Sequence, residues 1–388
     1  MSWMEPSERL KKLPPYLFVR LEELKEKAKK QGKDLIDLGI GDPDLPTPDF
    51  IIQAMKKALD NPENHRYPTS RGLLAFREAV CGFMEKRFGV KVSPDQVVSL
   101  IGSKEGIAHF PLAWINPKDI ALVPNPAYPV YKIGTIFAEG EPYFMPLKEE
   151  NNFLPDFDAI PKDIWERAKI LFLNYPNNPT SAVCELDFFE RAVFYAKKYK
   201  LWVVNDCAYS ELCFDGFLAP SILQVSGAEE VAIEFHSLSK TFNMTGWRVG
   251  FAVGAKPAID MLAKVKSNID SGVFQAIQWA GVVALKEGEQ AIKDIRRIYQ
   301  NRRDILAEAL NEVGLEYQKP KATFYFWVKC PKGLSSEEMV ALLLEQAGII
   351  ASPGSGYGEE GEGYIRLAIV TNEERLKEAK QRLLRLKL

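Results

Sequence analysis

The stretch that decides the fold is residues 236–254, His-Ser-Leu-Ser-Lys-Thr-Phe-Asn-Met-Thr-Gly-Trp-Arg-Val-Gly-Phe-Ala-Val-Gly. An apolar run precedes it at 231–235, and a second apolar run lies within it at 249–253. Short apolar runs bounded in this way are typical of buried strands. We therefore expect Lys240 to lie on a loop between two buried strands. If Ser-x-Ser-Lys is taken alone, an ordinary lysine on a solvated loop is the simpler interpretation.

Lys240 is accompanied by groups that suit a phosphorylated aldehyde. A lysine amine condenses with carbonyl groups, and it does so best in a partly desolvated pocket that keeps the amine neutral. Ser237, Ser239 and Thr241 offer hydroxyl groups to a phosphate. Arg248 adds a planar cation that can bind the same group through two hydrogen bonds. Pyridoxal 5'-phosphate (PLP) carries both an aldehyde and a phosphate, so the stretch predicts this cofactor.

The composition is that of an ordinary globular protein. The chain has 388 residues, of which 46% are hydrophobic and 26% charged, and its length suggests two or three domains. The formal net charge is -2 and no long basic run occurs, which argues against a nucleic-acid partner. No stretch approaches the roughly 20 apolar residues of a membrane helix, and no secretory signal opens the chain. We therefore expect a cytoplasmic location and no membrane partner.

The cysteine and histidine residues do not suggest a metal site. The five cysteines are scattered and include no Cys-x2-Cys pair, as expected for reduced thiols in a cytosolic protein. Only three histidines occur, so a histidine-built metal centre is not expected. His236 is the one histidine close to the proposed chemistry, and we interpret it as structural.

Apolar strands alternate with helices through most of the chain. Strands are expected at 97–101, 120–123, 169–173 and 201–204, and helices at 49–60, 73–88 and 186–199. Such alternation favours a mostly parallel sheet that is covered on both faces. Two long helices are expected next, at 257–286 and 287–312. A smaller α+β lobe is then expected, packed with a helix in 5–31, with strands at 323–328, 348–351 and 364–369 and helices at 336–346 and 373–387.

Polar residues follow the predicted strands, where α/β proteins bind their ligands. A glycine turn after the strand expected at 97–101 carries Ser103 and Lys104 into a helix. The free N–H groups at the start of this helix form a natural phosphate-binding site. Tyr128 follows the next strand and can stack on the face of the cofactor ring. Asp206 follows a later strand, and a buried carboxylate there would keep the pyridine nitrogen protonated. Each residue alone has a simpler interpretation, because a lone aspartate is often a turn cap and a lone tyrosine is usually core.

Asn178 and Tyr209 complete the set of candidate cofactor ligands. The 3-oxygen of the pyridine ring must be held by hydrogen-bond donors, which also lower the pKa of the imine beside it. Asn178 and Tyr209 lie beyond separate strands and carry such donors. The candidates occur in the order in which one sheet would present them, and this joint order favours a cofactor site.

Three motifs occur in an order and at a spacing that resemble a known family. They are Asn-x-Pro-Asn-Asn-Pro-Thr at 174–180, Asn-Asp-x-Ala-Tyr at 205–209 and Ser-x-Ser-Lys-x5-Gly-x-Arg-x-Gly at 237–250. Together they are similar to the class I/II aminotransferases, the fold-type I PLP enzymes, and the resemblance covers nearly the whole chain. It implies an α/β fold whose large PLP-binding domain, residues 46–286, holds a mostly parallel seven-stranded sheet. Residues 1–45 and 287–388 would form a small α+β domain with an N-terminal arm.

The resemblance also implies roles for the candidate residues. Lys240 would attach covalently to the cofactor and act as general base, while Asp206 would pair with the protonated pyridine nitrogen. Arg366, which alone would suggest a strand-surface ion pair, would bind the substrate α-carboxylate. Tyr67 would reach the cofactor phosphate of a neighbouring subunit, which implies a homodimer. The implied reaction is a ping-pong transfer of an amino group between an L-amino acid and a 2-oxo acid.

Four further stretches, 12–18, 38–44, 102–106 and 357–366, resemble one branch of the family, the LL-diaminopimelate aminotransferases. This resemblance implies transfer between LL-2,6-diaminopimelate and 2-oxoglutarate, in lysine biosynthesis, with Tyr16 and Gly41 touching the substrate. Three alternatives stay open: an alanine/aspartate-type or broad-specificity aminotransferase, a PLP-dependent C–S lyase of the same fold, and a non-enzymatic sensor that uses the aminotransferase fold. Ser181 stands where relatives usually have glycine, so the loop around it is expected to differ locally.

Overall fold

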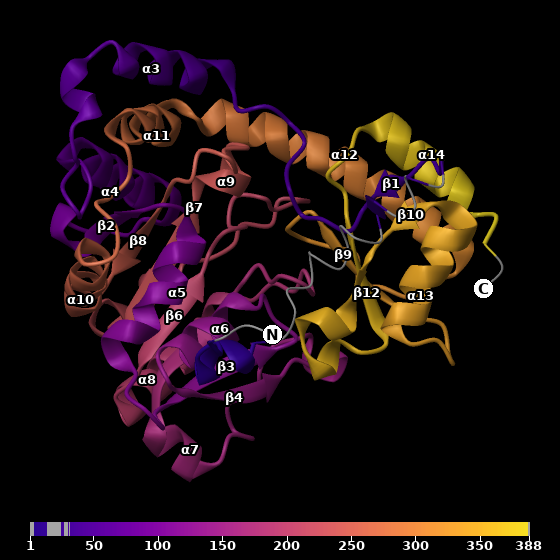
Figure 1. Cartoon of the computed structure of the whole chain (residues 1–388), viewed down its shortest axis with the longest axis horizontal. Helices are drawn as coiled ribbons and strands as arrows, with labels where there is room; N and C mark the ends of the chain where they lie inside the picture. Colours follow the sequence, from indigo (N-terminus) through magenta and orange to yellow (C-terminus); the bar gives the residue numbers. More distant parts are fainter. Residues whose placement is uncertain (1–3, 14–24, 27–29, 31, 387–388) are drawn as a thin grey trace.

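The computed structural model describes residues 4–13, 25–26, 30 and 32–386 of the chain. They form a larger lobe around a wide sheet and a smaller lobe, and the long helix α12, Glu289–Val313, runs from one to the other (Figure 1). The helix expected within 5–31 lies largely outside the described residues, which there include only the short helix α1, Glu8–Lys11, and a few positions beyond it.

The larger lobe is built on one seven-stranded sheet. Its strands follow the order β2-β8-β7-β6-β5-β3-β4. β8 is antiparallel to both of its neighbours, and every other adjacent pair is parallel, so the predicted mostly parallel sheet is confirmed. The strands are β2 Val97–Leu100, β3 Ile120–Asn125, β4 Glu141–Pro146, β5 Ala168–Leu173, β6 Trp202–Asp206, β7 Ala232–Ser237 and β8 Gly250–Gly254.

Helices cover both faces of this sheet because successive strand residues point to opposite sides. On one face, Val98, Ile170 and Val204 belong to a hydrophobic cluster with side chains of α5, α6 and α10. On the other face, Leu171 and Val203 pack with α8. The helices of this lobe are α3 Asp49–Leu59, α4 Leu74–Phe88, α5 Ser103–Trp114, α6 Val130–Phe137, α7 Lys162–Arg167, α8 Leu186–Tyr199, α9 Leu238–Thr241, α10 Lys256–Ser267 and α11 Gln275–Glu287.

The prediction of one continuous helix at 257–286 was wrong. The chain instead forms α10 and α11, separated by an irregular segment at 268–274. Gly272 in this segment has φ +95°, a left-handed conformation that glycine adopts without a steric penalty. The Asp270 carboxylate accepts hydrogen bonds from the Gly272 N–H (2.7 Å) and from the Lys266 ammonium (2.9 Å). These contacts stabilise a turn where the apolar periodicity alone suggested helix.

Strand β4 was not identified from the sequence. It lies at the edge of the sheet and pairs only with β3 among the described residues. Pro142 and Pro146 lie in it, and proline is tolerated at an edge because one side of the strand makes no ladder hydrogen bonds. Its side chains are mostly partly or fully exposed, so the strand lacks the apolar signal of its neighbours.

Among the described residues, the smaller lobe contains two small sheets and the helices α12, α13 and α14, and its predicted α+β composition is confirmed. An antiparallel sheet has the order β11-β12-β9, and β1 pairs in parallel with β10. The helix expected at 336–346 ends as α13 at Leu342 and continues as a π-helical turn, Leu343–Ala347. The elements are β1 Ile36–Asp37, β9 Tyr325–Lys329, β10 Ile349–Ile350, β11 Ser352–Pro353, β12 Tyr364–Ala368, α13 Ser336–Leu342 and α14 Glu373–Leu383, with α12 packed on α14.

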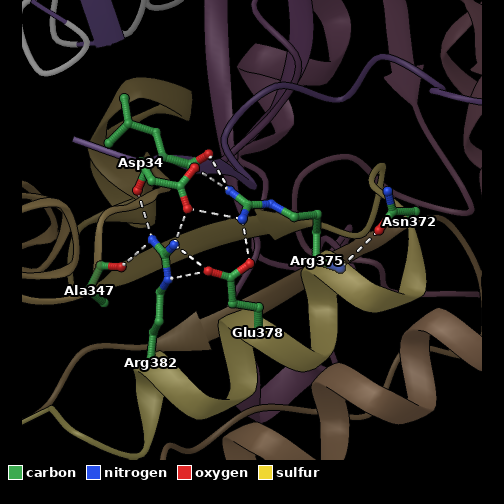
Figure 2. A network of polar contacts seen from close by, with 7 residues as sticks. Asp34, Ala347, Asn372, Arg375, Glu378 and Arg382 are labelled. Carbon is green, nitrogen blue, oxygen red and sulfur yellow. Dashed lines mark hydrogen bonds and ion pairs between the residues drawn. The ribbon is translucent and has the colours of Figure 1, made fainter. Parts of the chain in front are cut away.

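A polar network joins the N-terminal and C-terminal parts of this lobe (Figure 2). The Asp34 carboxylate, just before β1, accepts hydrogen bonds from Arg375 of α14 at 2.9 and 3.0 Å and also binds Arg382. Arg382 further donates to the backbone oxygens of Asp34 (2.8 Å) and Ala347 (3.2 Å). Glu378 lies between the two arginines and pairs with both. The network holds β1 beside β10, although the two strands are more than 300 residues apart in the sequence.

Candidate active site

A cavity of about 370 Å³ lies at the carboxyl ends of the large-lobe strands, where the two lobes meet. All the predicted site residues except Tyr16 and Tyr67 line it: Gly41, Ser103, Lys104, Tyr128, Asn178, Asp206, Tyr209, Ser237, Ser239, Lys240, Arg248 and Arg366. Tyr16 lies outside the described residues. Tyr67 is 86% exposed on the surface and does not line the cavity.

Lys240 lies in the short helix α9, so the expectation of a loop was wrong. Its Nζ donates a hydrogen bond to the Gly41 oxygen at 3.0 Å. Burial lowers the pKa of this amine to about 8; the Asp42 carboxylate opposes the shift, and the Arg366 and Arg248 cations favour it. A substantial fraction of Lys240 is therefore neutral and nucleophilic at mildly alkaline pH.

The turn from β2 into α5 forms an anion seat with Arg248. Gly102 precedes the helix with φ +92°, and a Cβ atom at this position would lie 2.3 Å from Arg248 Nη2. Arg248 donates to the backbone oxygens of Ile101 (3.1 Å) and Thr245 (2.9 Å), which anchors its guanidinium beside the helix start. Hydroxyl groups, a guanidinium and the N-terminus of a twelve-residue helix thus line one end of the cavity, and this donor set fits a phosphate.

Asp206 is a buried carboxylate at the end of β6. Tyr131 donates a hydrogen bond to its Oδ2 at 2.9 Å, and the Ala208 N–H donates to its Oδ1 at 3.2 Å. Burial raises the pKa of Asp206 to about 6, and the hydrogen bond from Tyr131 partly opposes this shift. A buried acid with a raised pKa is stabilised in its charged form by a nearby cation, so the site fits a protonated ring nitrogen.

Asn178 and Tyr209 offer donors on another side of the cavity. The Asn178 oxygen accepts a hydrogen bond from Arg366 Nη1 at 2.8 Å, which orients the amide and leaves its NH₂ group as the remaining donor. The Tyr209 hydroxyl lies 2.8 Å from the Tyr325 hydroxyl. Burial is the main reason why the pKa of Tyr209 is raised well above its usual value, so the phenol stays protonated and able to donate.

Arg366 is a fully buried cation on β12. Its Nη2 donates to the Gly39 oxygen at 2.9 Å, while its Nε has no hydrogen-bond partner among the residues that the structure describes. The Tyr325 ring lies beneath the guanidinium, with its centroid 4.0 Å from Cζ. Within the described part of the chain no carboxylate pairs with Arg366, and a buried cation of this kind fits an anionic ligand such as a carboxylate.

Six lining residues of the cavity were missed from the sequence: Ile40, Asp42, Asn174, Ala208, Thr245 and Tyr325. Asn174 donates to the Asp206 backbone oxygen at 2.7 Å and accepts from the Asn178 N–H at 2.8 Å, so it ties two strand-end loops together. It begins the motif at 174–180, which could have identified it. Tyr325 comes from the smaller lobe, and no motif in the sequence analysis includes it.

His236 has the structural role that the sequence suggested. Its Nε2 lies 3.0 Å from the Glu234 carboxylate, and its ring stacks on Phe251 at a centroid distance of 4.8 Å. Glu234 is also bound by the Ser221 hydroxyl (2.9 Å) and the Ile222 N–H (2.8 Å). This group of contacts lies within the sheet and does not line the cavity.

Comparisons with known proteins agree with this geometry. The family model for aminotransferase class I and II matches residues 33–383. The LL-diaminopimelate aminotransferase of Aquifex aeolicus is 55% identical over 385 residues, covering 99% of this chain and 100% of that protein. The protein of the same name from Moorella thermoacetica is 54% identical over 98% of both chains. The solved structure of apo-BacF from Bacillus subtilis superposes with a TM-score of 0.95 at 38% identity, covering 100% of this chain and 99% of the other.

Proposed function

Because this chain belongs to the class I and II aminotransferase family, we propose that it is an LL-2,6-diaminopimelate:2-oxoglutarate aminotransferase. The chain is a PLP-dependent enzyme of fold type I that moves amino groups between small molecules. The observation that carries the narrower proposal is identity of 50% or more, over at least 98% of the chain, to proteins that bear the LL-diaminopimelate name.

The residues that would hold PLP are those whose chemistry fits its parts. We assign the phosphate to the Ser103 end of α5, the hydroxyls of Ser237 and Ser239, and Arg248, with Lys104 beside them. Tyr128 would stack on the ring, and its own ring already lies 5.7 Å from the Lys104 ammonium. When bound, PLP supplies an aldehyde that joins amino groups covalently and a ring that accepts the electrons of the substrate Cα–H bond.

The chain's own groups then bind, orient and move protons. Arg366 binds the α-carboxylate, because it is a buried cation with an unpartnered Nε, and Gly41 borders the substrate without a side chain. Lys240 takes the α-proton as a general base, for which a pKa of about 8 is well suited at mildly alkaline pH. Asp206 would pair with the protonated ring nitrogen of the cofactor, and Asn178 and Tyr209 would donate to its ring oxygen.

Half-reactions test the substrate proposal. The holoenzyme is mixed separately with LL-diaminopimelate, glutamate, alanine, aspartate and tyrosine, and loss of its visible absorption is followed. Rapid loss with LL-diaminopimelate and glutamate, and little with the other three, is expected. Rapid loss with alanine or aspartate but not with LL-diaminopimelate would exclude this specificity. Steady release of ammonia and pyruvate without an added 2-oxo acid would instead indicate a C–S lyase.

We propose a homodimer in which Tyr67 completes the partner's site. Tyr67 is 86% exposed, and its segment packs against 272–275, where Gln275 donates to the Arg66 oxygen at 3.0 Å. Ile269 and Phe274 near this contact are also exposed, at 53% and 38%. Apolar side chains gathered on one surface support contact with a second copy of the chain.

Hybrid dimers test this arrangement. Lys240→Ala and Tyr67→Ala subunits are mixed, unfolded and refolded together. If Tyr67 serves the partner's site, each hybrid contains one site with both native residues, and activity well above that of either variant returns. If Tyr67 serves its own subunit, no native site forms and no activity returns.

We also propose the domain division 46–286 against 1–45 with 287–388, and a cytoplasmic location. The proposed division is supported by the sheets, because the seven-stranded sheet lies within 97–254 and the small sheets use 36–37 and 325–368. The location is supported by the five cysteines, all of which are free thiols. Among the described helices, none is both long and apolar enough to cross a membrane.

A further inference from the structure

Tyr325, the first residue of β9, contacts three groups of the proposed site at once. Its hydroxyl lies 2.8 Å from the Tyr209 hydroxyl, and the Arg366 guanidinium lies 4.0 Å above its ring. A Cβ atom at Gly41 would lie 2.0 Å from the Tyr325 hydroxyl, so only glycine leaves room for it. We propose that Tyr325 is a positioning residue that directs the Tyr209 hydroxyl at the cofactor and holds Arg366 ready for the substrate carboxylate. This inference rests on the proposed roles of Tyr209 and Arg366.

The direction of the hydrogen bond follows from counting protons. Each phenol has one O–H to donate, and in the structure either hydroxyl of the pair could be the donor. If Tyr209 donates its proton to the ring oxygen of the cofactor, its own oxygen must accept from Tyr325. Donation by Tyr325 polarises the Tyr209 hydroxyl and makes it a stronger donor, because hydrogen bonds in a chain reinforce one another in a buried site.

The aromatic ring of Tyr325 has a separate role, which concerns the Arg366 guanidinium. Arg366 is fully buried, and its two terminal nitrogens already donate to Asn178 and Gly39. The face of an aromatic ring carries partial negative charge, which stabilises a cation that has lost its hydration. The Tyr325 ring thus stabilises the buried guanidinium charge and keeps the group in place before an anionic substrate arrives.

The backbone of Tyr325 is held by two hydroxyl side chains. Ser181 Oγ, from the larger lobe, donates to the Tyr325 oxygen at 2.7 Å, and Thr323 Oγ1 accepts from the Tyr325 N–H at 3.0 Å. The Ser181 and Thr323 hydroxyls are themselves 2.8 Å apart and buried. Both residues have left-handed backbones, with φ +61° and +68°, which is rare for side-chain-bearing residues and above all for threonine. Such strain is found where surrounding contacts hold a site in one geometry.

Other titratable groups also face the hydroxyl pair. They are Arg366 on β12, Asp206 at the end of β6, Tyr299 on α12 and, beyond Tyr299, Asp42 and Asp44. A substitution that removes only the Tyr325 hydroxyl leaves all of them in place. A change in a titration of the bound cofactor then reports on the Tyr325 hydroxyl itself.

The decisive variant is Tyr325→Phe, which removes the hydroxyl and keeps the ring. Holoenzyme of the wild type and of the variant is titrated from pH 5 to pH 10 while the visible absorption of the cofactor is followed. Weaker donation to the ring oxygen raises the pKa of the adjacent imine, so we expect the midpoint to rise by about half a pH unit. The titration contains no amino donor, so its result is independent of the substrate specificity proposed above.

A matched control removes a tyrosine hydroxyl from the same lobe outside the cavity. Tyr317 donates to the Ala307 oxygen at 2.9 Å and does not line the cavity, so Tyr317→Phe should leave the midpoint unchanged. A Tyr325→Phe midpoint equal to that of the wild type would overturn the role of the hydroxyl.

A third variant, Tyr325→Leu, tests the ring. Glutarate is the probe, because it carries carboxylates but no amino group and cannot react. Loss of the ring should raise its Kd about 5-fold or more, whereas Tyr325→Phe should change it less than about 2-fold. Equal glutarate affinity of the wild type and Tyr325→Leu would overturn the role of the ring. The Tyr325→Phe titration decides the role of the hydroxyl whether or not the leucine variant holds PLP.

Discussion

At the scale of single residues, Asp206 shows how the cavity is prepared for a cation. Burial raises the pKa of this acid to about 6, although Tyr131 and the Ala208 N–H both donate to it. The folded protein without cofactor therefore holds a proton on Asp206 more tightly than the unfolded chain does. Its stability consequently falls as the pH rises from about 4 to about 6, and it loses up to about 3 kcal/mol over that window.

The first prediction concerns Asp206→Asn in the cofactor-free protein. At pH 7 the variant should be more stable than the wild type by up to about 3 kcal/mol, because it has no buried charge. Below pH 4 the difference should vanish, since the wild-type carboxyl is then protonated in both states. Urea denaturation at pH 4, 5, 6 and 7 measures the difference in free energy of unfolding between the variant and the wild type. A variant less stable than the wild type at pH 7 would show that contacts within the protein already stabilise the buried Asp206 charge without a ligand.

The same substitution should have the opposite consequence for catalysis. An asparagine cannot keep the ring nitrogen protonated, so kcat should fall by about 100-fold or more even with saturating PLP. Activity within about 3-fold of the wild type would exclude the proposed role of Asp206.

At the scale of elements, the proposed phosphate site at the turn between β2 and α5 depends on a close approach. Gly102 has φ +92°, and the Arg248 guanidinium lies where a Cβ atom would be. A side chain here would therefore displace Arg248 and add backbone strain. Hydrogen bonds from Arg248 to the backbone at Ile101 and Thr245 keep the cation at this place, and no carboxylate of the described residues pairs with it.

The second prediction is that Gly102→Ala lowers the affinity for PLP by about 10-fold or more, as measured by fluorescence titration of the apo protein. Gly216→Ala is the matched control. Gly216 also has a left-handed backbone, with φ +79°, but a Cβ atom there would meet nothing within 4 Å. Both variants should lose about 1 kcal/mol of stability from backbone strain, and only Gly102→Ala should lose cofactor affinity. Equal affinities for PLP would contradict the proposed seat.

At the scale of the whole molecule, Ser181 connects the two lobes. It lies in the loop that carries Asn178, and its hydroxyl donates to the Tyr325 backbone oxygen in the smaller lobe at 2.7 Å. A local difference in this loop is expected from the sequence, because relatives usually have glycine here. Ser181 keeps the left-handed backbone that glycine favours, with φ +61°, and adds a hydrogen bond between lobes.

The third prediction separates the contribution of the hydrogen bonds at position 181 from that of the backbone strain. Ser181→Ala loses the buried hydrogen bonds and keeps the strain, so it should destabilise the protein by about 2 kcal/mol. Ser181→Gly loses the same bonds but relieves about 1 kcal/mol of strain, so it should destabilise by about half as much. Urea denaturation gives the free energy of unfolding of both variants, and the alanine variant should have the lower value. A glycine variant less stable than the alanine variant would show that strain at this position is negligible.

Local sequence patterns determined most of the large sheet and most of the cavity residues. Strands such as β5 and β6 are largely buried on both faces and are therefore mostly apolar. The cavity residues follow these strands directly, so chain order alone places them at one edge of the sheet. Lys240, Asp206 and Asn178 were found in this way, through motifs that link residue type to chemistry at short spacing.

Tertiary structure decided what depends on contacts between distant segments. The local pattern predicted helix where a turn ends α10 and a loop where Lys240 is helical, and it gave no sign of the edge strand β4. Packing and backbone hydrogen bonds outweigh weak local preferences at these places. Tyr325 reaches Tyr209 across 116 residues, and Arg366 reaches Gly39 across 327. Apolar periodicity and short motifs describe neighbours along the chain, and they carry no record of which distant side chains meet when two lobes close around a cavity.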